Sequence, residues 1–110
     1  MSKVNELVVW LKGLGFTQDG LFLVYKDELA RYTIVPENDK IWLRVSISFR
    51  GKTFEKFCNL WWEQIEQHPI DNDPKDAVVF VLNDLFNLVM GDMLLEYKGN
   101  SILNVREGGR

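Results

Sequence analysis

The stretch that decides the fold is IWLRVSISFRGKTFEKF, residues 41–57. In its first ten residues, apolar side chains alternate with mostly polar ones. Successive side chains of a β-strand point to opposite faces of the sheet, so this alternation predicts a strand with one face on a core. The core-facing set is Ile41, Leu43, Val45, Ile47 and Phe49, and the opposite set is Trp42, Arg44, Ser46, Ser48 and Arg50.

The same stretch predicts a hairpin. Gly51 and Lys52 favour a tight turn, after which TFEKF returns antiparallel to the first strand. A two-residue turn at that place would set Lys56 opposite the core residue Ile47. We therefore expect a β-bulge to shift the register.

Upstream of this hairpin, residues 2–14 have the spacing of an amphipathic helix. Ser2 is the expected N-cap and Gly15 the expected stop. TQDG, residues 17–20, favours a turn, and the β-rich runs LFLVY and LARYTIV, residues 21–25 and 29–35, predict a second hairpin. Pro36 and the polar cluster after it predict a loop before the strand at residue 41.

Downstream, a short helix is predicted with Asn59 as its N-cap and its end before Pro69. On such a helix Trp61 and Ile65 share a face, whereas Trp62 lies about 100° around the axis from Trp61. Both indoles can hardly be buried in one groove. We expect one of them to lie at an edge or to contact another molecule.

The second downstream helix begins at Asp73 as N-cap with Pro74 at its first position. Its apolar side chains between residues 77 and 90 cover an arc of about 220°, although a helix on one sheet face needs a stripe of little more than about 100°. The surplus is either covered inside the chain, as in a central helix, or used to contact a partner. Gly91 is the expected stop, and residues 93–105 predict a closing hairpin.

Together these elements predict an α+β fold. We expect an antiparallel sheet of about four to six strands with an N-terminal helix and two later helices packed on one face. At 110 residues the chain is expected to be one domain, residues 1–110, with a loose tail from about residue 106.

Composition points to a cytoplasmic protein that does not bind a membrane. The N-terminus lacks the apolar core of a signal peptide, no run of about 18 uncharged apolar residues occurs, and a single cysteine fits a reducing compartment.

The net charge of −3 is unevenly distributed. Residues 40–57 carry five basic side chains against one acidic, and residues 58–96 carry one basic against eight acidic.

The residue types needed for catalysis are sparse. Cys58 and His68 would lie at opposite ends of a helix roughly 14 Å long, too far apart to act as a pair. The chain has no phosphate-binding glycine loop, and its one cysteine and one histidine do not make a zinc site. We therefore predict no enzyme activity, no catalytic residue, no cofactor, no metal and no small-molecule substrate.

Two functions remain, from different classes. The first is a protein-interaction domain that binds a partner protein or a second copy of itself, because exposed aromatic residues concentrate in binding hot spots. Its candidate residues are Trp61, Trp62, Val78, Phe80 and Phe86. The alternative is nucleic-acid binding by the basic strand face of residues 40–56, by stacking and phosphate contacts. Its candidate residues are Trp42, Arg44, Arg50, Lys52 and Lys56.

The opening helix, which ends in LKGLGF, and the strands after it resemble the type III secretion chaperones, which are dimers that bind unfolded effector proteins. The resemblance covers about the first third of the chain, rests on no specific motif and carries over no residues. It implies a chaperone-like adaptor. The chain is similar as well to small phage or mobile-element proteins that inhibit a host enzyme by presenting an acidic surface.

Overall fold

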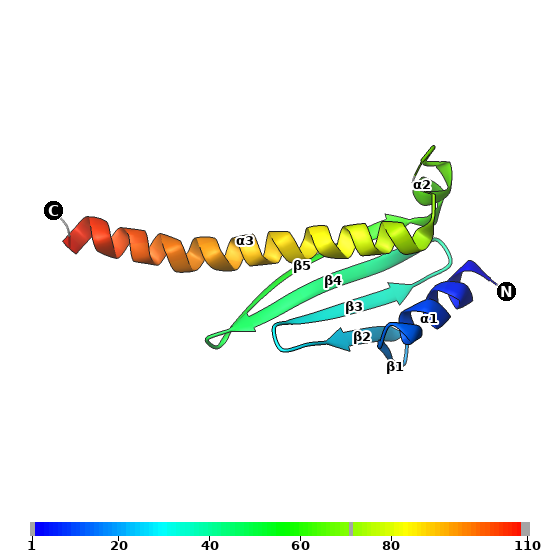
Figure 1. Ribbon diagram of the computed structural model, residues 1–110, viewed down its shortest axis with the longest axis horizontal. Helices are drawn as coiled ribbons and strands as arrows, with labels where there is room; N and C mark the ends of the chain where they lie inside the picture. The colour runs from blue at the N-terminus through cyan, green and yellow to red at the C-terminus, as the bar shows by residue number, and fades with distance from the viewer. Residues whose placement is uncertain (1, 71, 109–110) are drawn as a thin grey trace.

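Five strands form one antiparallel sheet in which each strand pairs with its neighbours in the chain, in the order β1-β2-β3-β4-β5 (Figure 1). The computed structural model describes residues 2–70 and 72–108, with side chains described as far as Tyr97. The strands are β1 (Thr17–Asp19), β2 (Phe22–Lys26), β3 (Ala30–Pro36), β4 (Lys40–Phe49) and β5 (Lys52–Trp61). The helices are α1 (Lys3–Gly13), α2 (Trp62–Gln67) and α3 (Pro74–Gly108).

The central hairpin of β4 and β5 pairs without interruption from Phe49↔Lys52 to Lys40↔Trp61. Its two-residue turn is Arg50–Gly51, with φ of +53° and +79°, so the predicted turn was wrong by one residue. Two positive φ angles match the twist of the flanking strands, and the strands need no bulge. The predicted bulge was wrong too, because Lys56 lies opposite Val45 and is accommodated there by Asp92 of α3.

Most N-terminal predictions are confirmed, but Pro36, which was expected in a loop, is the last residue of β3 and pairs with Ile41. The Ser2 hydroxyl accepts a hydrogen bond from the Asn5 N–H and caps α1, and Gly15 follows the helix with a φ of +111°. The second hairpin forms from β2 and β3. Residues 17–19, expected as part of a turn, instead form the short edge strand β1, and the chain turns at Gly20 and Leu21.

The predicted start of the short helix was wrong. β5 continues as far as Trp61, so Asn59 lies in a strand and α2 begins at Trp62 without a side-chain cap. Trp62 and Ile65, three residues apart, are the buried residues of α2, and the Trp62 indole N–H donates to the Glu37 carbonyl at 2.6 Å. Trp61 remains 41% exposed, so one indole is in the core and the other at the surface.

α3 is much longer than predicted. Asp73 caps it as expected, since its carboxylate accepts from the Lys75 N–H at 3.0 Å, but the helix passes through Gly91 and ends at Gly108. The predicted stop and the closing hairpin over residues 93–105 were wrong. A glycine inside a helix costs only about 1 kcal/mol, and contacts beyond it, such as the burial of Met93, offset that cost. Residues 106–108 of the expected tail belong to α3, and residues 109–110 lie outside the described residues.

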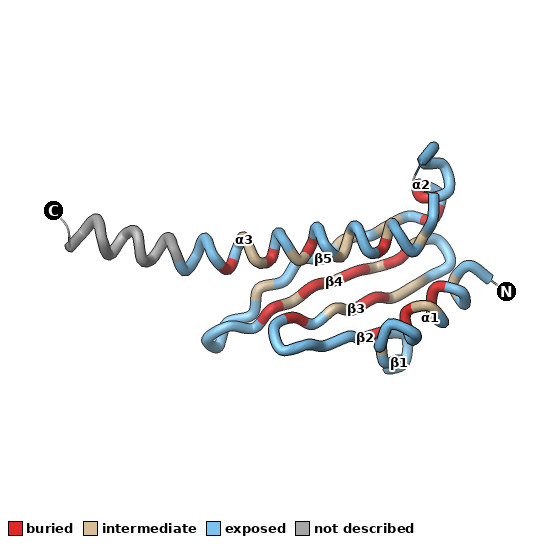
Figure 2. Tube along the Cα trace, in the orientation of Figure 1, coloured by how far each residue is buried: buried red, intermediate tan, exposed pale blue. Residues whose placement is uncertain are grey.

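The core lies between one face of the sheet and the helices, as Figure 2 shows. α1 covers β2 and β3, while α3 packs against both β4 and β5. Side chains from all these elements form a single apolar cluster, which confirms the predicted α+β class. Its most deeply buried members are Leu7 and Leu11 of α1, Leu23, Ile34, Ile41, Leu43, Val45 and Ile47 of the sheet, and Val78 and Val89 of α3.

α3 is both long and apolar. Between Pro74 and Tyr97 it is long and apolar enough to cross a membrane, judged by length and composition alone. Core helices of soluble proteins meet the same criterion when they are mostly buried, but only 22% of the most apolar window of α3 is buried within the chain. Most residues of this window are therefore not fully buried by the described part of the chain.

The two faces of α3 should respond differently to a charge. Val78 is fully buried, whereas Phe80, two residues away, is 73% exposed. We expect Val78→Asp to lower the free energy of unfolding by about 3–5 kcal/mol, because it buries an unpaired carboxylate. Phe80→Asp is expected to change it by about 0.5 kcal/mol or less. Urea denaturation of the two variants measures both effects, and equal destabilisation would contradict the packing of α3.

Candidate protein-interaction surface

The surface of α3 has two apolar flanks on either side of its buried stripe. On the flank toward β3, Phe86 stacks on Tyr32 with ring centroids 6.3 Å apart. On the flank toward β5, Asp92 forms an ion pair with Lys56 at 3.2 Å. Helical spacing places Ala77, Val81, Leu88 and Leu95 on this second flank, which we call the β5-side flank.

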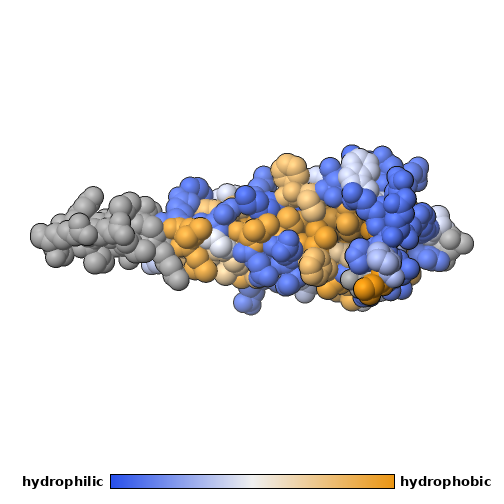
Figure 3. All heavy atoms as spheres, turned by 90° about the horizontal axis from the view of Figure 1, so that it is seen from above, coloured by the Kyte–Doolittle hydropathy of each residue, from blue (hydrophilic) through white to orange (hydrophobic). Residues whose placement is uncertain are grey.

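The β5-side flank is poorly covered. Leu88 is 50% exposed and Leu95 is 71% exposed, although both are large and apolar. In the space-filling view of Figure 3, apolar side chains form a stripe along α3 between hydrophilic margins. Contiguous exposed apolar surface with a polar rim is typical of a protein-interaction site or a membrane contact.

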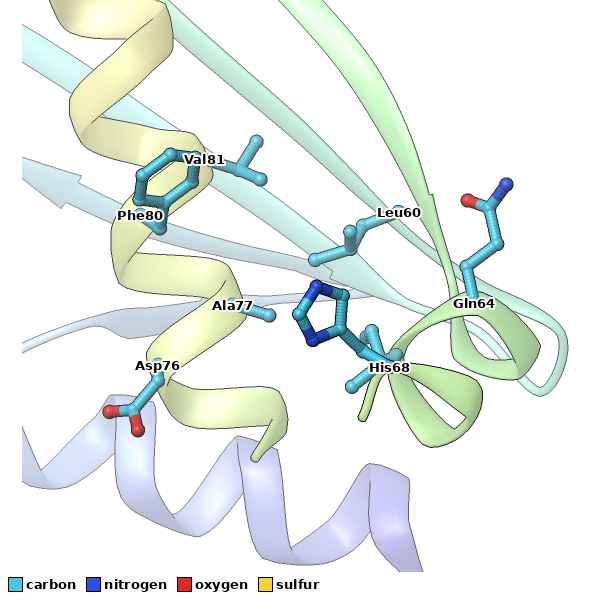
Figure 4. Close-up of a pocket in the computed structure, with 8 residues that line it drawn as sticks. Leu60, Gln64, His68, Asp76, Ala77, Phe80 and Val81 are labelled. Atoms are coloured by element: carbon cyan, nitrogen blue, oxygen red, sulfur yellow. The ribbon is translucent and has the colours of Figure 1, made fainter. Parts of the chain in front are cut away.

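At the N-terminal half of α3 this flank borders a groove of about 520 Å³ between α2 and α3. We call it the α2–α3 groove. Figure 4 shows Phe80 and Val81 on one side and Leu60 and His68 on the other. The remaining lining residues are Gln64, Ile65, Asp76 and Ala77. The groove is mostly apolar, and its size suits one or two large side chains of a partner.

β5 forms a free edge beside this flank. In the described part of the chain, no strand pairs with the outer side of β5, which is ten residues long and contains no proline. Such an edge presents unpaired N–H and C=O groups to another strand. Phe57, in the middle of β5, is 64% exposed, and its ring centroid lies 6.1 Å from that of Trp42.

The predicted protein-interaction residues fall into two groups. Phe80 and Trp61 are at the surface, and Phe86 is partly covered by Tyr32. Val78 and Trp62 are buried in the core, where other side chains of the chain cover them. Sequence reasoning did not single out Leu88, Leu95 and Phe57. The wide apolar arc of α3 already included Leu88, but periodicity alone did not show which side of the arc packs on the sheet.

The structure places the predicted nucleic-acid-binding residues on two different faces of the sheet and in a turn. Lys52 and Lys56 lie on the face of β5 that α3 covers, where they form ion pairs with Glu96 and Asp92. Trp42 and Arg44 lie on the opposite face, with the Arg44 guanidinium 5.3 Å from the Trp42 ring. Arg50 sits in the turn, 4.9 Å from the Tyr97 ring. The five residues therefore do not form one continuous basic surface.

Cys58 and His68 are placed for different roles. Cys58 lies in the middle of β5, partly covered, and desolvation raises the pKa of its thiol, helped by the negative charge of Asp84. A raised pKa disfavours the thiolate that a nucleophile needs. His68 follows α2 and lines the α2–α3 groove, where its Nδ1 accepts from the Ile70 N–H at 3.3 Å. Among residues 2–70 and 72–97, no group of three or more His, Cys, Asp or Glu side chains is arranged to hold a metal ion.

The chain matches no protein-family model, and no curated protein or solved structure is significantly similar to it. Its function therefore has to be inferred from its own surface.

The thiol chemistry of Cys58 can be measured directly. At about pH 8, close to the ordinary thiol pKa of about 8.5, we expect iodoacetamide to alkylate Cys58 more slowly in the folded protein than in urea, because the raised pKa reduces the thiolate fraction. Raising the pH should narrow the difference. Mass spectrometry of timed samples measures the rate, and equal rates in both states would contradict the burial of Cys58 under α3.

Proposed function

We propose that this protein is a non-enzymatic interaction domain that binds protein through the β5-side flank of α3 and the neighbouring α2–α3 groove. The observation that carries the proposal is the exposure of Phe80, Leu88 and Leu95 along one helix. Complete burial of such a side chain is worth roughly 1.5–3 kcal/mol, and each of these side chains, being 50–73% exposed, forgoes a part of that free energy. A partner that covers them recovers that free energy.

The arrangement has the parts of a protein-binding surface. Phe80 projects beside a groove that can accept an apolar side chain, and Trp61 adds an exposed indole at the end of β5. Acidic and amide side chains, among them Asp84 and Asn87, border the apolar flank. Interfaces commonly combine an apolar centre with such a polar rim. A chaperone-like adaptor or an inhibitor with an acidic rim fits this surface.

Photocrosslinking in producing cells tests the proposal. We expect a photoreactive benzoylphenylalanine in place of Phe80 to form covalent adducts with protein, either a second copy or another chain, because Phe80 is at the edge of the groove. The matched control is Leu21, which is 79% exposed but lies in the turn between β1 and β2. Equal adduct yields at the two positions, or no adduct at Phe80, would overturn the proposal.

Nucleic-acid binding remains the alternative, restricted to the open sheet face that carries Trp42 and Arg44. If it were the function, affinity for single-stranded DNA or RNA would fall steeply between about 50 and about 200 mM salt. We expect no such salt-dependent binding, because Lys52 and Lys56 are already paired with α3 and Glu55 shares the open face with Arg44. Fluorescence anisotropy of a labelled oligonucleotide checks this.

A further inference from the structure

The free edge of β5 is complementary to itself. When two β5 strands are paired antiparallel about a two-fold axis at Phe57, the two Phe57 rings meet on the open face of the sheet. On the face toward α3, Phe54 lies opposite Leu60 of the second copy, which joins two apolar side chains. Glu55 lies opposite Asn59 of the second copy, so no like charges face each other near the axis.

The contacts between β5 and α3 place Leu88 of α3 level with the same two-fold axis. Lys56 pairs with Asp92, and Cys58 is within the electrostatic influence of Asp84. Phe57 is midway between the two strand residues, and Leu88 is midway between the two helix residues. Leu88 of the β5-side flank therefore lies at the level of the axis, where it would meet Leu88 of a second copy.

The distance between the two α3 helices in such a dimer is suitable for helix packing. α3 packs against both β4 and β5, so its axis runs above the gap between them. Strands in a continuous sheet are about 4.8 Å apart, which would place two such helices about 10 Å from each other across the axis. Helices pack at about 8–10 Å. Strand pairing and helix packing can thus be satisfied at once.

This arrangement also fills the α2–α3 groove. With Leu88 on the axis and the helices antiparallel, Val81 lies opposite Leu95 of the second copy. Val81 lines the groove, and Leu95 is 71% exposed. The exposed leucine of one copy would therefore reach the apolar groove of the other, twice in the symmetric pair.

Across the axis one lysine lies between two carboxylates, because the helix register that sets Val81 opposite Leu95 also sets Asp84 opposite Asp92 of the second copy. The register places Lys56 opposite Cys58 of the second copy, and Cys58 lies near Asp84 of its own chain. Lys56 would therefore reach Asp84 of the second copy while it retains Asp92 of its own chain. Among the residues that the structure describes, Asp84 forms no ion pair within the chain.

The area is sufficient for a stable contact. A ten-residue strand is about 33 Å long, and a sheet with one covering helix is about 20 Å deep. A strip of these dimensions is on the order of the 800 Å² that each partner buries in a stable interface.

We propose that the protein forms a symmetric dimer in which the β5 edges pair across Phe57, the two α3 helices pack at Leu88, and Leu95 of each copy fills the groove of the other. The proposal deepens the proposed function and depends on it, since it names a second copy as the occupant of the same surface.

Disulfide trapping tests the geometry. In a Cys58→Ser background, we expect Leu88→Cys to form a disulfide-linked dimer under mild oxidation, because the two residues meet on the axis. Val79→Cys is the matched control, since Val79 is 51% exposed on the opposite flank of the same helix and Leu88 is 50% exposed. Crosslinking at Val79 but not at Leu88 would overturn the proposed arrangement.

Solution mass tests the association itself. We expect light scattering to give twice the 12.9 kDa chain mass for the unmodified protein. Leu88→Asp should raise the dimer dissociation constant by on the order of 30-fold or more, whereas Val79→Asp should leave it nearly unchanged. Far-UV circular dichroism measures whether both aspartate variants are folded. If Leu88→Asp does not fold, the comparison of Leu88→Cys with Val79→Cys still tests the dimer geometry.

The possible outcomes separate this inference from the proposed function. A monomer at every accessible concentration overturns the dimer. If Phe80 still crosslinks to a different protein in cells, the proposed function stands and the partner is not a second copy. If the protein is a monomer and Phe80 forms no adduct, both proposals fail.

Discussion

The packing of α3 on the central strands is the interaction on which the rest of the structure depends. Val78 and Val89 of α3 are fully buried in one cluster with Leu43, Val45 and Ile47 of β4. The buried apolar side chains of β4 all lie on this one face of the sheet, and the opposite face carries Arg44, Ser46 and Ser48. Because α1 covers β2 and β3, β4 and β5 are covered by α3, with α2 against β5.

This constraint explains why so much apolar surface remains outside. A helix of 35 residues is about 52 Å long, whereas the ten-residue strands beneath it are about 33 Å long. A flat sheet contacts one stripe of a cylinder, and the apolar arc of α3 is about twice as wide as that stripe. The β5-side flank, the α2–α3 groove and the free edge of β5 lie on the same side of the molecule, which is why we assign them one role.

The uneven charge distribution is explained within the chain. The basic segment at residues 40–57 and the acidic segment at residues 58–96 meet where Lys52 and Lys56 pair with Glu96 and Asp92. Exposed ion pairs of this kind stabilise a fold by roughly 0–1 kcal/mol each. Their larger effect is on orientation, because they place one flank of α3 beside β5. They also remove two cations from the surface to which the sequence assigned nucleic-acid binding.

Local patterns in the sequence determined the elements and their faces. The alternation at residues 41–50, the caps at Ser2 and Asp73, and the apolar arc of α3 depend on backbone periodicity and on hydrogen bonds between neighbouring residues. For that reason they can be predicted from the amino-acid sequence alone. The predicted one-sided α+β fold follows from the same patterns.

Tertiary structure decided where elements end and which apolar residues stay exposed. β5 continues to Trp61 because β4 offers it a partner as far as Lys40, and α3 passes Gly91 because contacts with the sheet continue beyond it. Trp62 rather than Trp61 is buried because a carbonyl 25 residues earlier, at Glu37, accepts its indole N–H. A sequence determines which residues share a face, but the free energy of covering that face depends on surfaces that only the folded chain brings together.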